Sequence, residues 1–202
     1  MANGASTVSR SNHPDPVRSY RCDVPPEVEP IWPVDLDDVR LWPMEGEDGP
    51  LLQELFDDLA DFRTPFGEPG SADAVSTFLA LPEGRDYNSK LLLGIWLNGG
   101  LAGALDCIMG YPTSAEWTVG LLVVADRYRR RGIARAVLDW LATIASGHGA
   151  ATLRVVVREA NSDGVAVARA LGYELEGHPS TVLGCLVLVR SLKDACAPRI
   201  SV

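Results

Sequence analysis

An apolar run, an arginine-rich turn and an amphipathic helix follow one another without interruption in the middle of this chain. Residues Trp117 to Val124 are almost all apolar, which predicts a strand buried on both faces. Apolar residues then recur at helical spacing from Ile133 to Ile144, and Gly147 follows where a helix C-cap is expected. A further apolar run at Leu153 to Val157 completes a predicted βαβ crossover within a sheet.

The turn between this strand and helix has the composition of an anion-binding site. Gly132 and Ala134 allow a diphosphate to approach the backbone, and the free N–H groups and dipole of the first helical turn attract negative charge. Five arginines crowd the turn: Arg127, Arg129, Arg130, Arg131 and Arg135. Because the chain carries a net charge of −9, this local patch predicts an anionic ligand. The alternative is an ordinary helix start with solvated arginines.

The turn resembles the coenzyme A signature of the GNAT superfamily of N-acetyltransferases. In that signature, Arg or Gln is followed by two residues, Gly, one residue, and then Gly or Ala. Arg129, Gly132 and Ala134 fill those places, and the resemblance runs from about Val39 to about Leu192. It implies an α/β (α+β) fold with a mixed, mostly antiparallel sheet flanked by helices and a central strand, phosphate loop and helix. It also implies acetyl-CoA (coenzyme A) as cosubstrate.

The resemblance places the pantetheine arm of the coenzyme along the strand and its pyrophosphate on the loop. The implied binding residues are Leu122, Val123, Val124, Arg129, Arg130, Arg131, Gly132, Ile133, Ala134, Arg135 and Asn161. Asn161 matches the family's Asn at the next strand-to-helix turn. Since Asn also caps helices through local hydrogen bonds, both roles stay open.

The candidate catalytic groups depart from the family's pattern. Aminolysis of a thioester needs a neutral amine, so a carboxylate usually takes the proton, directly or through water. Many family members have a Glu where this chain has Thr118, which cannot act as a base at neutral pH. Two carboxylates are candidate bases: Glu116, one pleat earlier on the same face, and Asp106, inside the apolar run Leu101 to Ile108. A solvated strand end and a structural carboxylate are the alternative interpretations.

The position of the family's general acid, often a Tyr, is occupied here by Ala168. A thiol with a pKa near that of Cys, roughly 8.5, can leave as the thiolate, so catalysis by positioning is feasible. Tyr173 is expected in the core rather than as a replacement acid. For Trp96, Tyr111 and Trp117, lining an acceptor pocket and packing in the core both stay open.

Length and composition fit one folded domain, since 202 residues with 47% hydrophobic and 22% charged residues suffice for a single core. We expect a flexible Pro-rich leader over 1–36, the acetyltransferase domain over 37–192 and a short tail over 193–202. The sequence has no signal peptide or membrane-spanning run, so we expect a cytoplasmic protein without a membrane partner. Dispersed Cys and His residues argue against a metal site, and the acidic chain argues against nucleic-acid binding.

Other elements are predicted from turn and capping residues. They are a first strand at Val39 to Trp42, a helix from Pro50 to Phe62, a helix capped by Ser71 and ending before Pro82, a hairpin of Leu91 to Leu97 and Leu101 to Tyr111 around Asn98-Gly99-Gly100, a helix at Ser162 to Leu171, and strands near Tyr173 to Glu176 and Leu183 to Leu192.

Two functions of different class are consistent with these features. One is an acetyl-CoA-dependent N-acetyltransferase that acts on a primary amine of a small molecule, such as an antibiotic, a polyamine, an amino acid or a secondary-metabolite intermediate. The other is a catalytically weak protein of the same fold that binds acyl-CoA as a sensor or interaction module. Turnover distinguishes the two, and a homodimer is left open as the assembly.

Overall fold

The computed structural model describes residues 30–60, 72–177 and 184–192, which build an eight-stranded sheet in the order β1-β2-β3-β4-β5-β6-β8-β7. The strands are β1 Val34–Leu36, β2 Val39–Pro43, β3 Lys90–Leu97, β4 Gly100–Ile108, β5 Glu116–Val124, β6 Thr152–Arg158, β7 Glu174–Leu175 and β8 Cys185–Ser191. Strands β5 and β6 pair in parallel, and the other neighbours are antiparallel. The predicted mixed, mostly antiparallel sheet with one βαβ crossover is confirmed.

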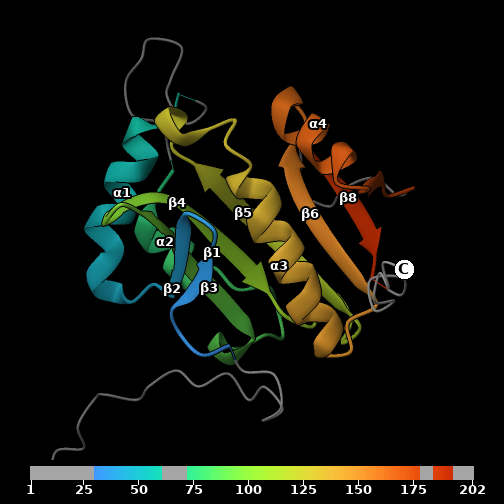
Figure 1. Cartoon of the computed structure of the whole chain (residues 1–202). Helices are drawn as coiled ribbons and strands as arrows, with labels where there is room; N and C mark the ends of the chain where they lie inside the picture. Colours follow the sequence, from blue (N-terminus) through green and yellow to red (C-terminus); the bar gives the residue numbers. More distant parts are fainter. Residues whose placement is uncertain (1–29, 61–71, 178–183, 193–202) are drawn as a thin grey trace, which may run out of the picture.

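Helices cover both faces of this sheet (Figure 1). They are α1 Gly49–Asp58, α2 Ala74–Leu79, α3 Ile133–Gly147 and α4 Ser162–Ala170. On one face, α3 and α4 close a core that includes Val137 and Leu141. On the other, α1 and α2 close a second core that includes Leu52 and Phe56. The sheet is thus a central layer between two helical layers.

Turn and capping residues set the predicted elements with small differences in their bounds. Asn98 (φ 52°) and Gly99 (φ 80°) adopt the two positive φ angles that a tight hairpin turn requires. Pro50 lies in the first turn of α1, but this helix ends at Asp58 instead of Phe62, because Leu59 is extended. Asp73 caps α2 by accepting a hydrogen bond from the Val75 amide at 2.9 Å. The predicted cap, Ser71, lies outside the described residues.

Two further boundaries differ from the sequence-based expectation. Helix α3 includes Gly147, and the left-handed glycine that follows its end is Gly149 (φ 79°). Strand β1 lies within the last residues of the expected leader, next to Trp32, whose ring packs edge-on against Trp140 at 6.2 Å. The rest of the leader, 1–29, and the tail, 193–202, lie outside the described residues. Among the described helices, none has the length and apolar character to cross a membrane.

Strand β5 has a bulge at Gly120, and the burial of the strand changes at this residue. Asp106 of β4 pairs with Leu121, but Cys107 pairs with Val119, so Gly120 is an extra residue on β5. Beyond the bulge the residues of β5 are only half-buried, and Gly120 itself is exposed. The prediction that the whole strand is buried on both faces is therefore wrong for its second half.

Candidate active site

The second half of β5 has one edge that β6 does not cover. Parallel pairing between the strands runs from Glu116↔Thr152 to Val119↔Val155 and stops there. Figure 1 shows the two strands diverging toward their C-terminal ends. From Leu121 to Val124, β5 pairs with β4 alone. An extended ligand could therefore pair with this edge as an additional strand would.

Of the three strand residues predicted to hold the pantetheine arm, Leu122 and Val124 have backbone groups that point toward this open edge, whereas those of Val123 point to β4. The Ala125 amide donates to the Ala102 carbonyl at 2.8 Å, so it belongs to the ladder with β4. Because hydrogen-bonding directions alternate along a strand, the backbone groups of Val124 and Leu122 point the other way. The Val124 carbonyl accepts from Nε of Arg129 at 3.1 Å, which confirms that it lies outside the β4 ladder.

The N-terminus of α3 lies at the end of this edge, and no side chain of the described residues caps it. Its N-cap is Gly132, with a left-handed φ of 82°, and the first turn contains no acidic residue. Within the described residues, the backbone amides of Arg130, Arg131 and Gly132 donate to no acceptor. A Cβ at Gly132 would meet no atom within 4 Å, so the backbone is open to a ligand. Unpaired amides at a helix N-terminus fit a phosphate group.

The arginines of this turn divide into two groups. Arg129 folds back onto the chain, since its guanidinium contacts Asp126 at 2.9 Å besides the Val124 carbonyl. Arg127 and Arg131 lie over the Tyr128 ring, at 5.0 and 5.5 Å from its centroid. Two exposed arginines, Arg130 and Arg135, form no ion pair with another described residue. These two are the side chains most available to an anion.

Asn161 is the N-cap of α4, because its Oδ1 accepts a hydrogen bond from the Gly164 amide at 2.8 Å. The local capping role predicted as one of two alternatives is therefore confirmed. This bond occupies part of the hydrogen-bonding capacity of the Asn161 side chain, whose amide nitrogen is the group left to act toward a coenzyme. The coenzyme role of Asn161 stays a prediction.

A pocket of about 290 Å³ lies beside the bulge of β5, on the face that α1 and α2 cover. Its lining includes Leu81, Pro82, Asp106, Tyr111, Thr118 and Gly120. Of the three aromatic residues considered from the sequence, only Tyr111 lines this pocket. Trp117 is 4% exposed and packs near His148 in the core of the α3 face, and Trp96 lines a separate hollow beside β2.

Asp106 is the carboxylate of this pocket. Its Oδ2 accepts a hydrogen bond from Nζ of Lys90 at 2.7 Å, while its Oδ1 is buried and accepts none within the described residues. Burial raises the pKa of Asp106 above its ordinary value, and the charge of Lys90 and its hydrogen bond oppose that rise. A desolvated carboxylate with a raised pKa and a free oxygen is suited to accept a proton.

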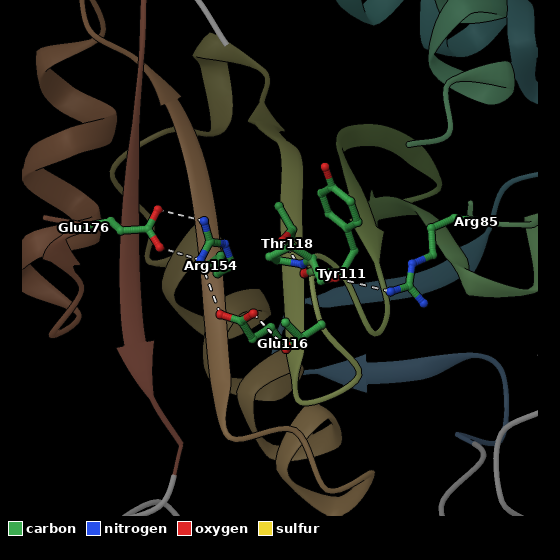
Figure 2. Close-up of polar contacts among 8 residues, drawn as sticks. Arg85, Tyr111, Glu116, Thr118, Arg154 and Glu176 are labelled. Atoms are coloured by element: carbon green, nitrogen blue, oxygen red, sulfur yellow. Dashed lines mark hydrogen bonds and ion pairs between the residues drawn. The ribbon is translucent and has the colours of Figure 1, made fainter. Parts of the chain in front are cut away.

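Glu116 lies in a different environment, at the closed end of β5 (Figure 2). Its carboxylate accepts from Nη1 of Arg154 at 3.3 Å and from the hydroxyl of Thr113 at 2.8 Å. Arg154 also binds both oxygens of Glu176, at 2.6 and 2.7 Å. Burial alone would lower the pKa of the Arg154 guanidinium, but Glu176 and Glu116 raise it, so Arg154 is a permanent cation between two carboxylates. This network ties β5 to β6 and to the chain after β7.

The residues at the family's acid and base positions are structural here. Thr118 donates its hydroxyl hydrogen to the Tyr111 carbonyl at 2.7 Å, as Figure 2 shows. Ala168 is 3% exposed and packs in the core. Tyr173 is 2% exposed, and burial raises the pKa of its hydroxyl, as expected for a core residue rather than an acid. Among the described residues, no group of three or more His, Cys, Asp or Glu side chains could hold a metal ion.

Two residues of this region were not singled out from the sequence, Lys90 and Arg154. Lys90 is one residue before the predicted strand Leu91 to Leu97, and Arg154 is the one charged residue inside an apolar run. Charged side chains are rarely buried without a partner, so a charged residue within an apolar strand is the signal that could have identified Arg154.

Comparison with known proteins agrees with this arrangement. The model of the Acetyltransferase (GNAT) family matches residues 52–173, which is more than half of the chain. Among proteins with curated functions, no sequence is significantly similar.

Solved structures show the same fold. An acetyltransferase from Thermus thermophilus is 24% identical with a TM-score of 0.62, and the match covers 78% of this chain and 99% of that one. The ribosomal-protein-S18-alanine N-acetyltransferase from Escherichia coli is 20% identical, with a TM-score of 0.57 and coverage of 76% and 94%. The PaiA N-acetyltransferase from Thermoplasma acidophilum, solved in complex with coenzyme A, is 14% identical, with a TM-score of 0.55 and coverage of 76% and 98%. The chain therefore belongs to the acetyltransferase (GNAT) family and is an acyltransferase.

Proposed function

We propose that this protein transfers the acetyl group of acetyl-CoA to a primary amine of a small molecule. The observation that carries the proposal is the continuity of three features along β5: uncapped amides at the N-terminus of α3, an open strand edge, and a pocket with a carboxylate. Gly120 precedes Val124 by four residues, or about 13 Å of strand at roughly 3.3 Å per residue. A linear donor held by its diphosphate at the loop would therefore present its thioester beside the pocket.

The amides of Arg130 to Ala134 and the side chains of Arg130 and Arg135 would hold the diphosphate. They supply a helix dipole, N–H donors and two cationic side chains at one place, and the side chains form no ion pair with another described residue. The outward backbone groups of Leu122 and Val124 would pair with the pantetheine amides, with Val123 between them in the β4 ladder. Ile133 and Arg129 belong to the same turn, where Arg129 fixes its shape through Val124 and Asp126.

Asp106 is the better of the two candidate bases. It lines the pocket and pairs with Leu121, next to the bulge, and one of its oxygens has no partner among the described residues. Glu116 precedes Gly120 by four residues, about 13 Å away along the strand, and Arg154 and Thr113 already occupy its oxygens. The proposed base is therefore Asp106, acting directly or through a water.

Acetyl-CoA supplies an electrophilic thioester, and its aminolysis forms an N–C bond, breaks the C–S bond and releases coenzyme A. Asp106 takes the proton that the amine loses. With Ala168 at the family's acid position, the thiolate leaves without a tyrosine acid, which is feasible for a thiol whose pKa is roughly 8.5. The chain then contributes orientation and proton removal, two effects that together account for large rate enhancements.

Release of coenzyme A thiol from acetyl-CoA, measured against a library of small primary amines, tests this function. Amino acids, polyamines, aminoglycoside-like antibiotics and aminated secondary-metabolite intermediates make up the library. Turnover of at least one amine well above the hydrolysis of acetyl-CoA alone is the expected result. Tight coenzyme binding without turnover of any amine would support the sensor or interaction module instead. A cytoplasmic location and a homodimer stay predictions from the sequence.

A further inference from the structure

Lys90 is a buried cation that the function proposed above does not yet use. Its side chain is 5% exposed, and its ammonium donates to Oδ2 of Asp106 at 2.7 Å and to the Ala80 carbonyl at 3.0 Å. Ala80 is the C-cap of α2 and lies in the lining of the same pocket as Asp106. The Lys90 ammonium thus bridges two residues of the pocket lining, Asp106 and Ala80.

The ion pair is not needed to hold these strands together. β3 and β4 already form a ladder from Lys90↔Ile108 to Leu97↔Gly100. Burying two charges is expensive, and a buried ion pair is often no more stabilising than apolar residues of the same volume. The pair is better explained by what it does for the carboxylate.

Two effects of Lys90 on Asp106 are evident in the geometry. The ammonium occupies Oδ2, so Oδ1 is the oxygen left for a proton or a water. Its positive charge also favours the ionised form of a carboxylate whose burial favours the protonated form. Without it, the pKa of Asp106 would rise further, and a protonated carboxyl could not accept a proton.

Few other charged groups face Asp106. Tyr111 is the other titratable side chain in the described lining of the pocket; the segment after α2 contributes Ala80, Leu81 and Pro82, and β5 contributes Thr118 and Gly120. The Cys107 thiol next to Asp106 lies in the core of the opposite face, where burial raises its pKa and keeps it neutral. Among the described residues, Lys90 is therefore the cation in contact with Asp106, and it opposes the effect of burial on that carboxyl.

We propose that Lys90 is a positioning residue for acetyl transfer, which keeps Asp106 ionised and, by occupying Oδ2, leaves Oδ1 to take the proton of the acceptor amine, directly or through a water. This inference rests on the function proposed above. It identifies a Lys–Asp pair, rather than a lone carboxylate, as the proton-accepting unit of the site.

The test compares Lys90→Met, which removes the charge at nearly constant length, with Lys90→Arg, which keeps it. The first measurement is a ¹³C NMR titration of the Asp106 carboxyl carbon, assigned by its loss in Asp106→Asn. In Lys90→Met the midpoint moves to higher pH, and in Lys90→Arg it stays near that of the wild type. An Asp106 midpoint that is the same in the wild type and in Lys90→Met overturns the inference.

The second measurement is the pH profile of kcat and KM with an amine that the wild type acetylates. Lys90→Met moves the acid limb of kcat to higher pH, lowers kcat about tenfold on that limb, regains it at pH values above the limb and leaves the KM for acetyl-CoA unchanged. A merely structural role would lower kcat equally at every pH. Arg154→Met, which breaks another ion pair on the same face, is the matched control and leaves the limb of the profile where it is.

Folding and function can be separated in this design. If Lys90→Met does not fold, Lys90→Gln, which keeps a donor for the Ala80 carbonyl, takes its place in both measurements. Absence of turnover by the wild type refutes the proposed function, whereas an unmoved Asp106 titration refutes the role of Lys90, because that titration needs no substrate.

Discussion

Substitutions at Gly132 can separate an effect on coenzyme A binding from an effect on folding stability. Its φ of 82° lies in the left-handed region, and a Cβ there would meet no atom within 4 Å. Gly132→Ala therefore adds backbone strain but no clash, which costs about 1 kcal/mol of unfolding free energy. For a domain of this size, that corresponds to a decrease in Tm of about 2–4 °C.

Gly149 provides a matched control at the other end of the same helix. Its φ is 79°, and a Cβ there would also meet no atom within 4 Å. Gly149→Ala should therefore destabilise the fold by about the same amount as Gly132→Ala. The two positions differ in that only Gly132 belongs to the turn expected to hold the diphosphate.

In Gly132→Ala, the added methyl group stands where a phosphate oxygen should approach the backbone. The loss of one charge-assisted hydrogen bond, about 1.5–3 kcal/mol, weakens coenzyme A binding roughly tenfold to a hundredfold. Gly132→Glu places both bulk and negative charge in the site, so we expect no measurable binding. Calorimetry with coenzyme A and thermal unfolding of each variant give the two quantities. Equal dissociation constants for Gly132→Ala and Gly149→Ala, or an unchanged one for Gly132→Glu, would refute the reasoning.

Four further predictions concern the two candidate bases, the pH dependence, the core residue Tyr173 and the ion pairs of Arg154. Asp106→Asn lowers kcat by about a hundredfold to ten-thousandfold with coenzyme A affinity intact, whereas Glu116→Gln changes kcat little. Steady-state kinetics measure kcat, and melting curves show that both variants fold. A lower kcat in Glu116→Gln than in Asp106→Asn would contradict the prediction. Because burial raises the pKa of Asp106, kcat rises with pH along one acid limb above the ordinary Asp range. The folded state binds that proton more tightly than the unfolded state, so the contribution of Asp106 to stability is lost as pH rises through its folded pKa. Tyr173→Phe leaves the pH profile of kcat unchanged and alters the unfolding free energy by less than about 1 kcal/mol, because the hydroxyl has no hydrogen-bond partner among the described residues. Loss of the alkaline limb of the kcat profile in this variant would show instead that Tyr173 is an acid. Arg154→Met lowers the unfolding free energy by about 1–3 kcal/mol in denaturant titrations, because the half-buried carboxylates of Glu116 and Glu176 lose their partner. An unchanged unfolding midpoint would show that these ion pairs do not hold the strands together.

The sequence predicts the turn between β5 and α3 well because the determinants of its geometry are local, and its role as a phosphate-binding loop stays a proposal. Left-handed backbone at Gly132, free amides at the start of α3 and nearby arginines depend on a few consecutive residues. The same holds for the hairpin turn at Asn98 and Gly99, whose φ angles are properties of those two residues. Periodicity and turn chemistry are sufficient for such features.

The spacing of the arginines in the sequence could not predict which of them contact other described residues. Arg127, Arg129 and Arg131 are engaged by Tyr128, Asp126 and the Val124 carbonyl, and these contacts depend on how the turn folds back on the end of β5. Arg130 has a positive φ of 65° and forms no ion pair with another described residue. A count of charges in the sequence gives the sign of the site, and the fold decides which charges act.

The pairing of Lys90 with Asp106 depends on an irregularity that no local pattern predicts. The tight turn sets Leu97 opposite Gly100, and an uninterrupted ladder from there would place Asp106 opposite Leu91, with Lys90 on the other face of the sheet. The register shifts between Ile95 and Trp96, so Asp106 lies opposite Leu92 instead. Lys90, two residues before Leu92, then shares the face of Asp106 and reaches it diagonally.

The bulge at Gly120 has the same kind of consequence for the choice of base. From spacing alone, Glu116 and Thr118 share a face and Glu116 could stand in for the family's Glu one pleat away. The structure shows that β5 is divided: below Gly120 it is paired on both sides, and above it one edge is open. Glu116 lies in the closed part, where it neutralises Arg154 and holds β5 to β6. Asp106 lies opposite Leu121, at the start of the open part. The point where the sheet divides, rather than sequence distance from the family's Glu, is therefore the reason why Asp106 and not Glu116 is the proposed base.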